Sequence, residues 1–256
     1  MEAQRPVIAA RALAKSYGRV EALRGVDIDI YKSEVHAIVG DNGAGKSTLL
    51  KILSGAASSS SGSMLLDGEP VQFDSPQDAR DRGIETVYQD LALAGDRSCT
   101  ANIYMGREVM KPGLLGKLGL LDRRTMNENV HRFFADLSIP ITDPTRNVRA
   151  FSGGQRQGVA IARAAIWATH VVLLDEPTAA LGVRQRDAVA DLIRRLKARG
   201  LAVVLVTHDI PEVIKIADRV TVLRLGKAVA TRFTKAIDLP WVVATMVGHD
   251  VKEASQ

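Results

Sequence analysis

The fold of this chain is decided by the stretch Gly40-Asp41-Asn42-Gly43-Ala44-Gly45-Lys46-Ser47-Thr48. Its spacing, two glycines around four residues followed by Lys and Ser, is typical of a phosphate-binding loop (P-loop). The apolar residues 35–39 before it predict a buried strand, and residues 48–53 after it predict a helix. A turn that only joins two elements would explain the glycines, but not the Lys-Ser pair with both flanks. The stretch therefore predicts a nucleoside triphosphate site.

The residue types of the P-loop supply the chemistry that such a site needs. Glycines let successive backbone N–H groups point inward, and the N-terminus of the following helix adds partial positive charge. Lys46 supplies a full charge for the β- and γ-phosphates. The Ser47 hydroxyl supplies a ligand for Mg²⁺.

Composition limits the class of protein. Of the 256 residues, 46% are hydrophobic and 25% are charged, an ordinary globular balance. The net charge of +5, from 34 basic and 29 acidic residues, is too small and scattered for a nucleic-acid surface. The densest basic run, residues 194–199, closes a predicted helix, where cations complement the helix C-terminus. Cys99 is alone, which excludes an internal disulfide and a cysteine-based zinc site.

No segment has the pattern of a targeting or membrane-spanning element. Residues 1–6 lack the apolar core of a signal peptide. No apolar run approaches the ~20 residues that span a bilayer. We therefore expect a soluble chain.

Short strands are expected in the N-terminal third of the chain. Residues 24–30 alternate strictly between polar and apolar side chains, as in a half-exposed antiparallel strand. The serine-rich residues 57–63 predict a polar loop that is too short to separate domains. Ser75 has the features of a helix N-cap, since Pro and Asp follow it in the first turn. Further strands are predicted at residues 64–66, 71–73 and 84–88.

Helices alternate with uniformly apolar strands in the second half of the chain. The predicted helices are residues 123–137, 152–167 and 183–199, and the predicted strands are residues 171–174 and 202–206. This alternation indicates a parallel sheet that is covered on both faces. Ligands of such sheets bind at the carboxyl ends of the strands. The P-loop, Gln89, Asp175, Glu176 and His208 all follow strands, so we expect them to converge in space.

These patterns predict an α/β fold. It has a P-loop NTPase core with a mainly parallel sheet, an N-terminal antiparallel β subdomain and an inserted helical subdomain. We expect residues 1–256 to form a single nucleotide-binding domain. Residues 1–88 and 168–256 would form the core with its antiparallel part, and residues from about 89–167 the helical subdomain.

One further segment indicates which family of P-loop proteins the chain resembles. Phe151 is followed by Ser152, Gly153, Gly154 and Gln155, and this run resembles the signature sequence of ATP-binding cassette (ABC) proteins. The resemblance covers nearly the whole chain and implies that ATP and Mg²⁺ are its cofactors. In that family the signature reaches across a head-to-tail dimer to the γ-phosphate held by the partner's P-loop. A serine, two glycines and a helix start form a second anion site, whereas an ordinary serine-capped helix explains only the serine. Phe151 replaces the Leu that is usual there.

The resemblance also implies roles for residues outside the signature. Asp175 would hold Mg²⁺ through water, and Glu176 would polarise the attacking water. His208 matches the histidine that contacts the γ-phosphate. Gln89 matches the glutamine that touches Mg²⁺ or the water. With Lys46, these residues form the expected catalytic set, and Ser47, Gln89 and Asp175 form the expected metal set.

Tyr17 and Gly182 lie near these motifs in the sequence. Tyr17 lies at a turn, where an aromatic ring stacks on a base as readily as it serves simple packing. The resemblance favours stacking on a base, because Tyr17 matches the aromatic residue that stacks on adenine in that family. Gly182 stands where many family members have an Asp whose carboxylate makes a contact across the dimer.

Three further phrases, residues 83–90, 101–108 and 178–183, resemble the ATPases of bacterial monosaccharide importers. Well-known members, as in ribose uptake, fuse two cassettes, whereas this chain has one P-loop and one signature. We therefore expect it to pair with a second copy of itself under integral membrane permease subunits. This places it on the cytoplasmic side of the cell inner membrane, linked indirectly to a periplasmic sugar-binding protein and not to nucleic acid. The alternatives are an importer ATPase for a nucleoside or polyol, and a soluble ABC ATPase of ribosomes or DNA repair.

Overall fold

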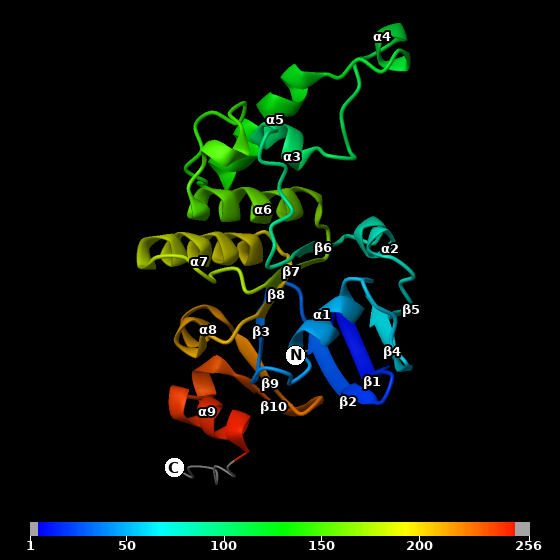
Figure 1. Cartoon of the computed structure of the whole chain (residues 1–256), viewed down its shortest axis with the longest axis vertical. Helices are drawn as coiled ribbons and strands as arrows, with labels where there is room; N and C mark the ends of the chain where they lie inside the picture. Colours follow the sequence, from blue (N-terminus) through cyan, green and yellow to red (C-terminus); the bar gives the residue numbers. More distant parts are fainter. Residues whose placement is uncertain (1–4, 249–256) are drawn as a thin grey trace.

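The computed structural model describes residues 5–248, and these contain two sheets and the helices that cover them (Figure 1). The expectation about a signal peptide rests on residues 1–6, of which residues 1–4 lie outside the described part. Within residues 5–248, no helix combines the length and the apolar character needed to cross a bilayer.

The first sheet is antiparallel, as expected for the N-terminal third, but the strand predicted at residues 71–73 lies at residues 69–71 instead. Its order is β2-β1-β4-β5. The strands are β1 (Ile8–Tyr17), β2 (Val20–Ile30), β4 (Ser61–Leu66) and β5 (Glu69–Val71). The loop expected at residues 57–63 is wrong in its second half, because Ser61 and Ser63 pair with Ala14 and Arg11 of β1. The open edge of β1 provides backbone partners there, and these outweigh the weak strand preference of serine.

The second sheet carries the P-loop. Its order is β10-β9-β3-β8-β7-β6, parallel throughout except for the antiparallel β10–β9 pair. The α/β class with a mainly parallel sheet is therefore confirmed. The strands are β3 (Val35–Val39), β6 (Ile84–Val87), β7 (Val171–Asp175), β8 (Ala202–Val206), β9 (Arg219–Arg224) and β10 (Lys227–Phe233).

The helices begin and end within two residues of the predicted positions wherever a helix was expected. They are α1 (Lys46–Leu53), α2 (Pro76–Asp81), α3 (Cys99–Ile103), α4 (Leu114–Lys117), α5 (Arg123–Asp136), α6 (Gly153–Trp167), α7 (Val183–Ala198), α8 (Ile210–Ile216) and α9 (Leu239–Val247). Two short 3₁₀ turns, Val148–Ala150 and Thr234–Ala236, complete the described elements. Ser75 caps α2 by accepting a hydrogen bond from the Asp78 N–H, as the sequence predicts.

The parallel sheet is buried on both faces because its strands alternate between two apolar cores. Ile38, Leu173 and Val204 face the core shared with β1, β2 and α1. Ala37, Leu174 and Leu205 face the core shared with α5, α6 and α7. Figure 1 shows α3, α5 and α6 stacked beyond α7, on the side of the sheet away from β1 and β2. The P-loop lies at the edge where the parallel strands end.

Candidate functional site

The P-loop follows β3 directly and leads into α1. Gly45 immediately precedes α1 with a φ of 106°. A Cβ at this position would lie 2.7 Å from the Ala22 carbonyl oxygen and 2.7 Å from Leu23 Cδ2 of β2. Only glycine fits this backbone conformation at this close approach. The antiparallel sheet therefore fixes the position of the loop before α1.

Lys46 is held across the loop that precedes it. Its side-chain ammonium donates hydrogen bonds to the Gly40 carbonyl (2.7 Å) and the Asp41 carbonyl (3.0 Å). The residue is only 8% exposed, and this burial lowers the pKa of Lys46, while Glu176, Asp41 and Asp175 oppose the shift. An ammonium group has three donors, so one remains for a ligand.

A pocket of about 510 Å³ opens in front of the P-loop. It brings together side chains that follow three different parallel strands: Gln89 after β6, Asp175 and Glu176 at the end of β7, and His208 after β8. The loop residues in its wall are Asn42, Gly43, Gly45, Lys46, Ser47 and Thr48. The pocket therefore combines a cation and a glycine loop with carboxylate, amide and imidazole groups.

The oxygen donors of this pocket suit a magnesium ion. The Ser47 hydroxyl, the Gln89 amide and the Asp175 carboxyl line the same wall, and Mg²⁺ prefers oxygen ligands. Burial raises the pKa of Asp175, with a further contribution from Glu176, while Lys46 and Lys51 oppose it. A partly buried carboxylate of this kind gains from a bound cation, so the residues present fit the ion.

Glu176 and His208 contact each other inside the pocket. The distance between Glu176 Oε1 and His208 Nδ1 is 2.8 Å. The Glu176 backbone N–H also donates to the Val206 carbonyl at 2.8 Å, which ties the end of β7 to the end of β8. Glu176 has a φ of 49°, a left-handed conformation that is strained for a side chain of this size. Strain of this kind is typical of functional sites.

Among the nucleotide-contacting residues expected outside the signature segment, Gly40, Ala44 and Tyr17 do not line this pocket. Gly40 provides only its carbonyl, which accepts from Lys46, and Ala44 is buried beneath the loop. Tyr17 ends β1 with 48% of its surface exposed, and the Lys15 ammonium lies 5.1 Å above its ring. Conversely, Glu21 and Ala22 of β2 line the pocket although no local motif in the sequence predicts them.

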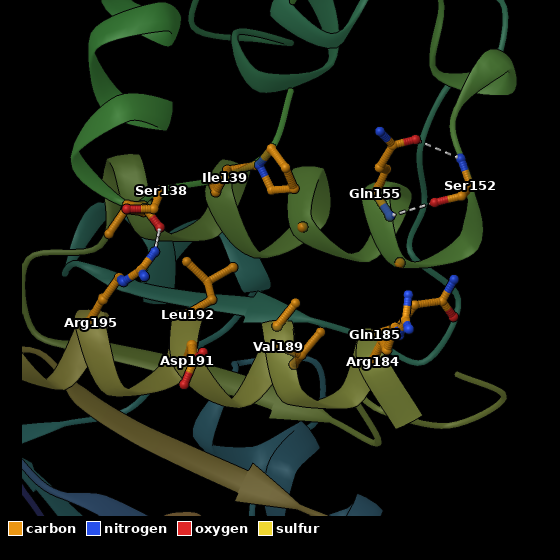
Figure 2. A pocket seen from close by; sticks show the side chains of 15 residues that line it. Ser138, Ile139, Ser152, Gln155, Arg184, Gln185, Val189, Asp191, Leu192 and Arg195 are labelled. Atoms are coloured by element: carbon orange, nitrogen blue, oxygen red, sulfur yellow. Dashed lines mark hydrogen bonds between the residues drawn. The ribbon is translucent and has the colours of Figure 1, made fainter. Parts of the chain in front are cut away.

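The signature segment caps α6 and lies apart from the P-loop pocket. The Ser152 Oγ accepts from the Gln155 N–H at 3.3 Å, and the Gln155 Oε1 accepts from the Ser152 N–H at 3.0 Å (Figure 2). Both residues line a second cavity of about 450 Å³ between α6 and α7. One copy of the chain therefore does not bring Ser152 and Lys46 into the same cavity.

The two signature glycines have different surroundings. A Cβ at Gly154 would lie 2.9 Å from Gln185 Cγ of α7, so a side chain there collides with the neighbouring helix. A Cβ at Gly153 would meet only Leu181 Cδ2, at an ordinary 3.8 Å. Figure 2 shows Ser152 and Gln185 at the same end of the paired helices, so the N-termini of α6 and α7 lie side by side. Both helix N-termini add partial positive charge to this edge.

Comparison with known proteins identifies the family and the fold of the chain. Residues 23–179 match the family model described as ABC transporter. The chain is 46% identical to the fructose import ATP-binding protein FrcA of Rhizobium meliloti, covering 96% of this chain and 95% of that one. It is also 46% identical to the xylose/arabinose import ATP-binding protein XylG of Sulfolobus acidocaldarius, over 86% and 85%. A ribose import ATP-binding protein of Burkholderia pseudomallei is 39% identical, but the chain spans only 47% of its length.

Solved structures show the same fold. An ATP-binding cassette of an ABC transporter in its ADP conformation superposes with a TM-score of 0.82 at 23% identity, covering 96% of this chain and 100% of that one. The cbiO1 structure from Clostridium perfringens gives 0.79 at 25% identity, over 97% and 96%. The family model matches more than half of the chain. The fructose import protein aligns with nearly all of it. The chain therefore belongs to the ABC transporter family and has the fold of its ATP-binding cassettes.

Proposed function

We propose that this chain is the ATP-hydrolysing subunit of a bacterial importer for a monosaccharide, acting as a head-to-tail pair of identical copies. The observation that carries the proposal is the separation of two anion-binding elements. Lys46 and Ser47 line one cavity, whereas Ser152 and Gln155 line another. A second copy in reversed orientation would supply the missing signature to each P-loop pocket, and a two-fold pair completes both sites.

The P-loop, the expected metal ligands and Tyr17 have separate roles in this proposal. The P-loop from Gly40 to Thr48 cradles the phosphates through its backbone N–H groups, and Lys46 adds its free donor. Ser47, Asp175 and Gln89 would hold Mg²⁺, which neutralises phosphate charge when bound. Tyr17 would stack on adenine beside the turn that joins β1 to β2.

Glu176 and His208 would direct the attack of water. An ionised carboxylate only accepts hydrogen bonds, so Glu176 requires its histidine partner to carry the proton on Nδ1. The remaining oxygen of Glu176 can then orient a water molecule and accept its proton. His208 holds the carboxylate in place from the end of the neighbouring strand.

The transport role rests on the relatives. Proteins 46% identical to this chain are named for the import of fructose and of xylose and arabinose. We infer a monosaccharide as cargo, with integral membrane permease subunits as partners on the cytoplasmic side of the inner membrane. A periplasmic sugar-binding protein would deliver the sugar from the other side. Residues 89–167 would form the subdomain that transmits closure from Gln89 to the permease.

A paired-variant experiment tests the proposal. Glu176→Gln keeps size and hydrogen bonding but removes the charge that polarises water, so hydrolysis should fall by at least ~10²-fold. ATP·Mg²⁺ should then hold this variant as a dimer in gel filtration. Adding Ser152→Arg should abolish the dimer, because bulk and charge block the signature.

Ser75→Arg in the same background is the matched control. Ser75 caps α2 through a hydrogen bond of 3.3 Å, the same length as the bond by which Ser152 caps α6. The loss of a cap alone should leave the ATP-dependent dimer intact. A Glu176→Gln protein that stays monomeric with ATP would contradict the proposed pairing.

A further inference from the structure

Exposed apolar side chains gather in one small region of the molecule. Within residues 5–248, six of the fifteen exposed large hydrophobic residues fall between positions 105 and 120. They are Met105, Met110, Leu114, Leu115, Leu118 and Leu120. Figure 1 shows α4 at the far end of a projection that leaves the body of the chain between α3 and α5. We call residues 109–121 the apolar arm.

The apolar arm has an ordered backbone. The Lys111 N–H donates to the Leu120 carbonyl (2.8 Å), and the Asp122 N–H donates to the Val109 carbonyl (2.7 Å). At the tip, a Cβ on Gly116 would lie 2.0 Å from the Lys111 carbonyl oxygen, so the two sides of the arm meet closely. The leucines are therefore presented on a preformed scaffold, which lowers the entropy cost of binding.

The charges of the apolar arm have one sign. Residues 109–121 contain Lys111 and Lys117 and no acidic residue. Among residues 5–248, neither ammonium forms a salt bridge, although Lys111 attracts Asp122 over a longer distance. Glu108 and Asp122 stand at the base of the arm, beside the exposed cation Arg123, so the excess of positive charge lies within the arm itself. An anionic surface would complement this region.

We propose that the apolar arm contacts an anionic lipid bilayer, with its leucines in the boundary between headgroups and acyl chains and its lysines at the lipid phosphates. Leu114 and Leu118 are 72% and 70% exposed, and nearly every residue of the tip is exposed. A fluid lipid phase can surround such an exposed tip on all sides. Lysine is depleted in protein interfaces, which favour Tyr, Trp and Arg, but it is attracted to anionic lipid.

This inference rests on the proposed function, which places the chain beneath a membrane. The apolar arm would then act as a second contact beside the permease and would fix the orientation of the ATPase. One short apolar loop with two lysines gives weak, reversible binding, as is typical of a single membrane-binding signal.

Sedimentation of the full chain with vesicles tests the inference. The protein should sediment with phosphatidylglycerol vesicles and much less with phosphatidylcholine vesicles. Leu118→Asp should weaken the binding at least ~10-fold, because it places a charge among the acyl chains. Lys111→Gln combined with Lys117→Gln should weaken it roughly 10-fold by removing the attraction to anionic lipid.

Leu225→Asp is the matched control, since Leu225 is a 67% exposed leucine in the turn between β9 and β10. It should bind vesicles as the parent does, and ATP hydrolysis should be unchanged in every variant. Equal binding of Leu118→Asp and Leu225→Asp, or no binding of the parent to anionic vesicles, would overturn the inference.

Loss of permease co-purification in Leu118→Asp with no change in vesicle binding would assign the arm to the permease instead. Vesicle binding without any permease partner would leave the inference intact and count against the transport role.

Discussion

The carboxylate of Glu176 accepts a hydrogen bond of 2.8 Å from Nδ1 of His208, although 31 residues separate the two in the chain. The contact arises because β7 and β8 are parallel neighbours that end at the same edge, with Asp175 paired to Val206. The imidazole itself is largely exposed and faces the pocket. The histidine is therefore in a position to orient the carboxylate without contributing to the core.

Replacing His208 should affect turnover without affecting the fold. We expect His208→Ala to lower the rate of ATP hydrolysis by roughly 10²-fold, on the scale of losing a positioned proton-transfer partner. Its thermal midpoint should stay near that of the parent, because the side chain is 71% exposed. Phosphate release and thermal unfolding on the same sample check both parts. Parental turnover would remove His208 from the catalytic set.

Lys46 should be indispensable for nucleotide binding. Lys46→Ala removes the ammonium that bridges the Gly40 and Asp41 carbonyls and has one donor left for phosphate. We expect ATP binding to weaken and hydrolysis to be lost. Lys51→Ala, on the exposed side of α1, is the control and should keep both properties. Nucleotide titration by fluorescence distinguishes the variants, and equal affinity in the two would contradict the assigned site.

The two signature glycines should respond differently to the same substitution. Gly154→Ala places a methyl group 2.9 Å from Gln185 Cγ, so it should destabilise the fold by about 1–3 kcal/mol through overpacking. Gly153→Ala has room inside the chain, and its stability should be unchanged or slightly higher. Its hydrolysis rate should nevertheless fall roughly 10-fold or more, because the methyl group displaces the approaching partner site. Thermal unfolding and phosphate release separate the two effects, and the reverse pattern would contradict the assignment.

The buried His36 should make stability depend on pH. Complete burial lowers the pKa of His36 to about 3, with a further contribution from the charge of Arg219. The Nε2 atom of His36 lies 2.7 Å from Thr221 Oγ1, and its Nδ1 atom lies 3.8 Å from the Glu34 carboxylate. The folded pKa lies below the unfolded value of about 6.5, so between these values the unfolded chain binds the extra proton. Stability should therefore fall as the pH drops, by about 2 kcal/mol between pH 7 and pH 5.

His36→Val should reduce the loss of stability between pH 7 and pH 5. The Thr221 hydroxyl would still have a hydrogen-bond partner in this variant, because the Thr231 hydroxyl lies 2.8 Å away. His131→Val, at an exposed position of α5, is the control and should unfold like the parent at both pH values. Urea unfolding at pH 7 and pH 5 provides the measurement. The same pH dependence in His36→Val and the parent would show that other groups cause it.

Much of the candidate site is predictable because it depends on local patterns. Asp175 and His208 each follow a strand of four or five consecutive apolar residues, and parallel strands present their ends at one edge. The P-loop pattern fixes the strand before it and the helix after it in the same way. Glu21 and Ala22 lack such a signal, since they reach the pocket only because β2 packs against the P-loop.

Other features depend on tertiary contacts that short-range patterns do not encode. The serine run forms part of β4 because β1 offers it a partner, and no element is expected after residue 209 although α8, β9, β10 and α9 follow. Strand β10 is an edge strand with mostly exposed side chains, so its formation depends on pairing with β9. The order of the apolar arm likewise depends on the approach of Gly116 to Lys111, which no helix or strand period predicts.

The most direct test of the composite site is complementation between two inactive variants. Lys46→Ala inactivates the P-loop of one copy, and Ser152→Arg inactivates the signature of the other. In a head-to-tail pair of these two proteins, the intact P-loop of the second faces the intact signature of the first. If copies exchange freely, about half of the dimers are mixed and each has one functional site, so the equimolar mixture should recover about a quarter of parental ATP hydrolysis. A mixture no more active than either variant alone would contradict the account.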